Sequence, residues 1–226
     1  MAKADLSLEK LSTTMQDSAI QIQRIGRTTV RVPIVGTSPL IIHRFSEKSK
    51  KQMLDTMQGK KSPRENKDPE AEYEAAAYRF EDGGFGFPAI AFKQATVAAC
   101  RYFSQIAMTQ AKQCLFFNGE VGLDGQKLVR IVGEPVMRED VVTVGRGGTD
   151  LRYRPEFREW SAELEVVFLP SMLDVKSVLA LIEAGGMGVG VGEWRPTRDG
   201  DFGTFMLDPD RAVEFVEEQV INYKVA

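Results

Sequence analysis

Two segments of the chain alternate between apolar and polar residues, and they limit what it can fold into. Residues 28–36 alternate and are rich in β-branched side chains. In residues 160–169 every second side chain is apolar: Trp160, Ala162, Leu164, Val166 and Phe168. Successive side chains of a strand point to opposite faces, so both segments are predicted to be strands with one buried face.

Two other segments have apolar residues at helical spacing. They predict a long Ala-rich helix over 91–111 and a second amphipathic helix over 173–184. Further strands are expected near 128–137 and 141–145, and residues 78–88 predict a hairpin around Asp82-Gly83-Gly84. The order strand, helix, strands, helix, strand predicts an α+β fold with a ferredoxin-like βαββαβ core that carries hairpin and loop insertions.

The expected organisation is one domain over 28–207 with a segment on either side. Residues 1–27 form an N-terminal arm, read either as a short helix with a loosely attached stretch or as a frayed terminus. Residues 208–226 form a C-terminal tail, with a helix over 209–219 capped by Asp208 or Asp210. Insertions are expected at about 44–82 and 138–158. Pro33 indicates an edge strand or a bulge, because proline lacks the N–H that a central strand donates.

Composition excludes several classes of protein. The 226 residues carry 29 Lys and Arg against 32 Asp and Glu, a net charge of −3, so the chain is no polycation. The sequence has neither an apolar run long enough to span a membrane nor the apolar stretch of a secretory signal. We read the two cysteines, Cys100 and Cys114, as reduced thiols in or near the core of a cytoplasmic protein.

The near-neutral total hides segments of opposite charge. Residues 44–67 hold eight basic and three acidic residues, and residues 68–82 hold one basic and six acidic residues.

Cofactor motifs are missing: there is no P-loop, and the glycines at 186–192 follow a helical pattern instead of opening one. With two Cys and one His, a standard zinc site is not available. We therefore expect neither metal nor cofactor.

Three segments carry the residue types that bind nucleic acid. Residues 87–101 (FPAIAFKQA…R) start a helix, where backbone N–H groups and Lys93 suit a phosphate. A glycine-dense hairpin is expected over 185–207. Its residues 185–196 (GGMGVGVGEWRP) combine glycines, which allow close approach of another backbone or of a strand, with Trp194 and Arg195. Residues 138–158 interleave five arginines with Tyr153 and Phe157. The alternative readings are solvated helix and hairpin residues and an ordinary core Trp.

The first two of these segments together resemble the RAMP superfamily, the repeat-associated RNA-binding proteins of CRISPR systems, and especially their backbone subunits. Pro88, Lys93 and Arg101 match the helix start of that family, and Gly185–Gly192 with Arg195 match its glycine-rich loop. The resemblance implies a modified RNA-recognition-type domain that oligomerises along a strand. The segments 44–67 and 138–158 would be its finger-like and thumb-like insertions.

The function expected from these features is sequence-independent binding of single-stranded RNA or DNA by a non-catalytic subunit that forms filaments, as in a CRISPR effector backbone. Its partners would be the strand, neighbouring copies and other effector subunits. The candidate binding residues are Arg44, Lys48, Lys50, Lys51, Lys93, Arg101, Arg146, Arg152, Arg154, Gly188, Gly190, Gly192, Trp194 and Arg195.

Three alternatives stay open. A phage protein that binds single-stranded DNA and acts in recombination would share the fold. A metal-independent endoribonuclease would use His43, the single histidine, as general base on a 2′-OH beside a stabilising Lys. A protein-interaction module would pair its oppositely charged blocks between copies.

Overall fold

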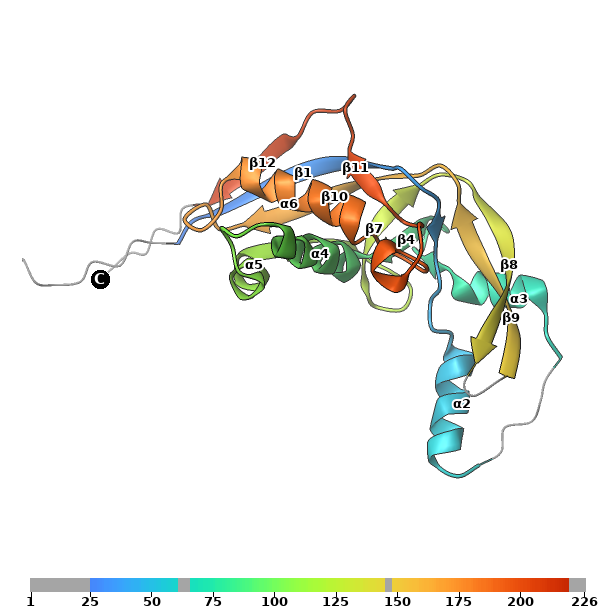
Figure 1. Cartoon of the computed structure of the whole chain (residues 1–226). Helices are drawn as coiled ribbons and strands as arrows, with labels where there is room; N and C mark the ends of the chain where they lie inside the picture. The colour runs from blue at the N-terminus through green and yellow to red at the C-terminus, as the bar shows by residue number, and fades with distance from the viewer. Residues whose placement is uncertain (1–24, 61–65, 145–147, 220–226) are drawn as a thin grey trace, which may run out of the picture.

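The structure is a computed structural model that describes residues 25–60, 66–144 and 148–219. Its main sheet places the strands in the order of a ferredoxin-like fold (Figure 1). β1 and β10 pair antiparallel in the middle, β11 and β12 lie on the far side of β1, and β5 and β7 on the far side of β10. The strands are β1 (Arg27–Gly36), β5 (Leu115–Phe117), β7 (Lys127–Val132), β10 (Ser161–Phe168), β11 (Phe205–Leu207) and β12 (Glu214–Gln219). The α+β class is confirmed.

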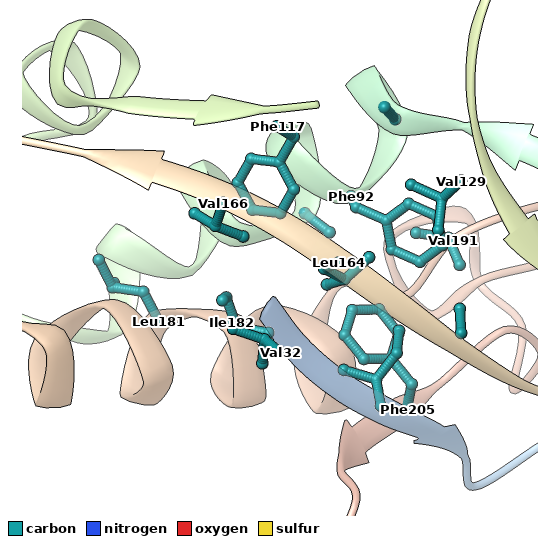
Figure 2. Close-up of a cluster of buried hydrophobic side chains, with 14 of the residues drawn as sticks. Val32, Phe92, Phe117, Val129, Leu164, Val166, Leu181, Ile182, Val191 and Phe205 are labelled. Carbon is teal, nitrogen blue, oxygen red and sulfur yellow. The ribbon is translucent and has the colours of Figure 1, made fainter. Parts of the chain in front are cut away.

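Helices cover one face of this sheet (Figure 1). They are α4 (Ala89–Ala98), α5 (Met108–Cys114) and α6 (Val175–Gly188). The alternating apolar residues of β1 and β10 point toward them, and Val32 and Leu164 are completely buried. Figure 2 shows these two side chains packed with Phe92 of α4 and Ile182 of α6. Cys100 and Cys114 are unpaired thiols buried on this side of the sheet, as expected.

The predicted helix over 91–111 is interrupted. α4 ends at Ala98 and is followed by the 3-10 turn η1 (Ala99–Tyr102), and helix resumes only at Met108. A continuous helix over 91–111 would be about 32 Å long. The eight-residue strand β10 beneath it spans only about 27 Å. The break lets the chain turn back within the length of the sheet, so that β5 can pair with β10.

The C-terminal helix predicted over 209–219 is wrong. Residues Glu214–Gln219 form β12, which pairs with the first half of β1. That half of β1 would otherwise have an unpaired edge, and pairing satisfies its backbone groups. Asp208 caps no helix: its carboxylate accepts from the N–H of Asp210 at 3.0 Å in the turn between β11 and β12.

Pro33 lies in a central strand, so the expectation of an edge position is wrong. Its carbonyl accepts from the N–H of Asp208 at 3.0 Å, and the nitrogen of a strand residue faces the same side as its carbonyl. On that side β12 pairs with residues 27–31 and β11 with residues 34–36. The missing N–H of Pro33 therefore falls between the two partner strands.

Short strands extend the sheet beyond β7. They are β3 (Tyr78–Arg79), β4 (Phe85–Pro88) and β6 (Glu120–Val121). β3 and β4 form the hairpin predicted around Asp82-Gly83-Gly84, and β4 pairs with β7. β4 leads directly into α4, so the main sheet positions the helix start that carries Lys93.

A second unit projects from one end of the main sheet (Figure 1). Its three-stranded sheet contains β2 (Leu40–Ile41) and the long hairpin of β8 (Pro135–Val144) and β9 (Gly148–Phe157). The helix α3 (Pro69–Ala76) packs on β9. The helix α2 (Glu47–Met57) extends away with nearly all its described side chains exposed. The hairpin is inserted between β7 and β10, and α2 and α3 lie between β2 and β3.

Candidate nucleic-acid interface

The hairpin predicted over 185–207 is wrong, because the glycine-rich segment begins as the end of a helix and continues as a loop. α6 continues through Gly185, Gly186 and Gly188. A Cβ on Gly185 would lie 2.8 Å from the carbonyl oxygen of Ala95, and one on Gly186 would lie 2.1 Å from that of Phe205. The first two glycines therefore allow α6 to approach the backbones of α4 and β11. This close approach of another backbone is one of the two roles that the sequence predicted for the glycines.

The next two glycines shape the loop after α6. Gly190 has φ +69° and donates its N–H to the carbonyl of Gly185 at 2.9 Å, which closes the helix end. Gly192 has φ +79°, and a Cβ there would lie 2.6 Å from the carbonyl oxygen of Ile41. Both glycines of the predicted site are thus required by backbone geometry.

Gly188 differs from them because its neighbour is an exposed aromatic ring. A Cβ on Gly188 would meet Tyr102 2.5 Å from the hydroxyl oxygen and 2.9 Å from the ring. Tyr102 ends η1 and is 56% exposed, and the preceding Arg101 is exposed too. The structure therefore places Gly188, a predicted binding residue, against the residue that directly follows Arg101, another one. Tyr102 was missed in the sequence, although an aromatic residue directly after Arg101 was the available signal.

Lys93 does not stand open at a helix N-terminus. Its Nζ donates to the carbonyl of Lys112 at 3.0 Å, at the end of α5, and lies 5.0 Å from the ring centre of Phe116. A phosphate at Lys93 would have to compete with these two contacts.

Arg138, Asp140, Arg154 and Glu156 of the arginine-rich hairpin share one face, where they pair with acids or bases. Arg138 contacts Asp140 and Glu156, each at 2.9 Å. Arg154, opposite Arg138 in the register, contacts Asp140 at 2.5 Å and Glu193 at 3.5 Å. Only 1% of Arg154 is exposed, so it is no surface ligand for a phosphate, contrary to the prediction. Its buried Nε has no hydrogen-bond partner among the described residues.

Trp194 joins this hairpin to the loop after α6. The guanidinium carbons of Arg138 and Arg154 lie 5.2 and 4.8 Å from its ring centre, and the ring of Phe202 lies 6.0 Å away. Trp194 also has φ +49°, an uncommon conformation for a large residue that these neighbours hold in place. The Trp of the predicted site thus acts first as an anchor between the two units. We name the six residues Arg138, Asp140, Arg154, Glu156, Glu193 and Trp194 the arginine–tryptophan cluster.

His43 lies at the edge of the arginine–tryptophan cluster. Its Nδ1 is 3.8 Å from the carboxylate of Glu193, and its side chain is partly exposed. Burial lowers the pKa of His43 below its ordinary value of 6.5; Glu193 opposes this shift, and Arg152 and Arg154 add to it. The imidazole is therefore held toward its neutral form beside a carboxylate that can orient it.

The remaining predicted residues are dispersed. Arg44 donates to the carbonyl of Ala75 at 3.2 Å and so fastens the end of α3. Arg195 donates to the carbonyl of Gly192 at 2.9 Å, and Arg152 lies 3.8 Å from Asp150. The lysines of α2, Lys48, Lys50 and Lys51, are exposed, and Lys50 pairs with Glu47 at 2.6 Å. Arg146 lies outside the described residues.

A cavity of about 570 Å³ on the sheet face opposite the helices offers no ring on which a base could stack, because none of its lining residues is aromatic. Its three arginines are paired with acids: Arg130 with Glu120 at 2.9 Å, Arg211 with Glu163 at 2.5 Å and Arg31 with Glu165 at 3.7 Å. RNA-recognition sheets instead stack bases on aromatic side chains.

In the described ranges we also find no group of three metal-ligating side chains and no helix that could cross a membrane.

Comparison with known proteins gives matches in structure but none in sequence. No family model and no curated protein matches the sequence. The structure is similar to a chain of the cryo-EM structure of the Type III-B Cmr-beta bound to cognate target RNA. The TM-score is 0.41 at 10% sequence identity, over 96% of this chain and 67% of that chain.

Proposed function

We propose that this chain is a sequence-independent subunit that binds single-stranded nucleic acid, RNA or DNA, and lines up along the strand with further copies of itself. The observation that carries the proposal is the exposed ring of Tyr102 on Gly188, next to the exposed Arg101. Aromatic rings stack on any base, and a neighbouring arginine contacts the backbone phosphates. Binding of this kind needs no particular sequence.

Two further features support the same assignment. Both segments that resemble RAMP proteins reach this ring: Tyr102 directly follows residues 87–101, and Gly188 of residues 185–196 lies against it. The exposed lysines of α2 add positive charge on the projecting unit. Because α2 and η1 belong to different units, a strand long enough to reach both would run across the molecule (Figure 1).

The test is binding of a labelled oligonucleotide of mixed sequence, about 30 nucleotides long and therefore several times the span of one site. Fluorescence anisotropy should show binding of the single strand, with weaker binding of the duplex of the same sequence. The affinity should fall steeply from about 50 to about 200 mM salt, because bound phosphates release counterions. No binding at low salt would contradict the proposal and favour the protein-interaction module. RNA and DNA strands run in parallel identify the ligand, and light scattering on a longer strand counts the bound copies.

A second candidate is a metal-independent endoribonuclease, which the pair of His43 and Glu193 favours. A neutral imidazole beside an orienting carboxylate can take the proton of a 2′-OH, and the partly exposed Arg152 can stabilise the developing charge. Cleavage of labelled RNA in excess chelator that is lost in His43→Ala, while binding persists, would establish this activity. Intact RNA after long incubation would exclude it.

A further inference from the structure

An apolar groove opens on the helical side of the molecule, in the region between η1 and α5 and the start of α6. It has a volume of about 690 Å³. Phe103, Ile106, Met172, Leu173 and Leu181 contribute its apolar lining, and Phe103 and Met172 are exposed. Polar residues complete its wall, among them Gln105, Gln110 and Asp174. An exposed apolar patch with a polar rim is the usual form of a binding surface for another polypeptide segment.

The chain enters the main sheet beside this groove. Thr28, near the start of β1, is opposite Phe168 at the end of β10. Four residues after Phe168 comes Met172, whose N–H donates to the carbonyl of Leu169 at 2.9 Å in the turn that leads to α6. Figure 1 shows the start of β1 at the same end of the sheet as this turn. Whatever precedes residue 25 therefore leaves the sheet within a few residues of the groove wall.

The 24 residues before that point lie outside the described part of the chain, but their sequence fits the groove. Leu8, Leu11 and Met15 follow one another at spacings of three and four residues, the spacing of an apolar helix face. Ile25 follows Met15 by ten positions, so these two residues can lie at most about 36 Å apart. A tether this short gives the segment a millimolar effective concentration at the groove, so weak apolar contacts are enough for occupancy.

We propose that the N-terminal segment of the same chain docks in this groove through Leu8, Leu11 and Met15, as an amphipathic segment in an apolar groove. The docked segment covers Phe103 and Met172. This inference does not depend on nucleic-acid binding and is tested without any oligonucleotide.

The first test compares oxidation of two methionines by hydrogen peroxide in the full chain, followed by peptide mass mapping. Met172, in the groove, and Met187, at the end of α6, are 45% and 64% exposed in the structure. Methionine oxidation follows exposure, so docking should make Met172 react several-fold more slowly than Met187. Leu11→Asp should remove this protection and leave Met187 unchanged, whereas Thr13→Asp, off the apolar spacing, should preserve it. Equal rates in the unmodified chain, or protection that survives Leu11→Asp, would overturn the proposal.

A second test identifies the occupant by disulfide formation. In the full chain, Leu11→Cys with Met172→Cys should crosslink within one monomer, while Leu11→Cys with the remote Met57→Cys should not. The native thiols Cys100 and Cys114 are buried and should stay out of the reaction. Crosslinked dimers would assign the groove to another copy, and crosslinking of Met172→Cys to Ile221→Cys instead would assign it to the C-terminal segment. Either result would overturn docking by the chain's own N-terminal segment.

Discussion

The guanidinium of Arg154 contacts the carboxylate of Asp140 at 2.5 Å across the β8–β9 hairpin, where both side chains are almost completely buried. The same guanidinium lies against Trp194 and reaches Glu193, both in the loop after α6. One buried charge thus connects the projecting hairpin to the main domain. Burying a charge is costly unless it is paired, so the position of the hairpin depends on its acidic partners.

Asp140→Ala should therefore destabilise the protein strongly. The substitution leaves Arg154 buried with only the longer contact to Glu193, and we expect the free energy of unfolding to fall by about 3 kcal/mol. Urea unfolding followed by circular dichroism measures the change. Glu47→Ala is the matched control, because it removes the exposed pair with Lys50 and should leave stability nearly unchanged. Equal effects of the two substitutions would refute a central role for the buried pair.

Two glycines of α6, Gly186 and Gly188, should respond differently to alanine. In Gly186→Ala the new Cβ meets the backbone carbonyl of Phe205, which cannot move easily, so unfolding should become easier by about 2 kcal/mol. In Gly188→Ala the new Cβ meets the side chain of Tyr102, which can rotate away. Gly188→Ala should keep most of the stability but weaken binding of single-stranded nucleic acid. Urea unfolding and anisotropy on the same preparations separate the two effects.

Tyr102 should contribute to binding through its ring. Tyr102→Ala should weaken binding of a single strand by about 1–3 kcal/mol, the range for loss of one stacked base. Tyr102→Phe keeps the ring and should bind normally. Phe116→Ala serves as control, because this ring is also partly exposed, at 41%, but lies beside Lys93. Normal binding by Tyr102→Ala would mean that the strand passes elsewhere.

His43 should make stability depend on pH in one direction. Its folded-state pKa is lowered, chiefly by burial, so the folded protein binds fewer protons than the unfolded chain just below pH 6.5. The contribution of His43 to the free energy of unfolding is complete above the pKa that it has in the unfolded chain. It is lost as the pH falls toward the folded pKa, by at most about 1.4 kcal/mol per pH unit.

The measurement is urea unfolding between about pH 7.5 and about pH 5.5, the range in which histidine titrates. His43→Gln should flatten the loss of stability on the acid side, since no other histidine is present. Glu193→Gln removes the charge that raises the pKa, so the histidine should titrate at still lower pH by NMR. A titration midpoint at or above 6.5 in the unmodified protein would contradict the burial of His43.

The sequence was informative where local pattern and tertiary environment agree. The alternation of residues 160–169 predicted β10, because a strand with one buried face needs that pattern wherever it lies. The spacing over 173–184 predicted α6 but not its continuation through Gly185, Gly186 and Gly188. Glycines disfavour a helix locally, and only the close packing against Ala95 and Phe205 requires them there.

The candidate site was predictable in part. Gly188 lies against Tyr102, which directly follows Arg101 in the chain, and both Tyr102 and Arg101 are exposed. Arg154 and Trp194 were predicted as ligands because of their residue types. The burial of Arg154 depends on Asp140 of the opposite strand and Glu193 of another loop, and Trp194 is half-buried against Arg138 and Arg154. No local pattern reports such a partner.

By itself the sequence determined the layers of this protein. It shows which segments alternate and which have a helical apolar face, and therefore that helices cover one side of an antiparallel sheet. The tertiary structure decided the rest. β12 is a strand because β1 offers it an unpaired edge, and the helix over 91–111 is broken because the sheet beneath is shorter than the helix would be. An arginine of the hairpin has a structural role where an acid from elsewhere in the fold pairs with it, and is available to bind a ligand where none does. Periodicity depends on neighbours along the chain, whereas pairing, length and charge compensation depend on residues that only folding brings together.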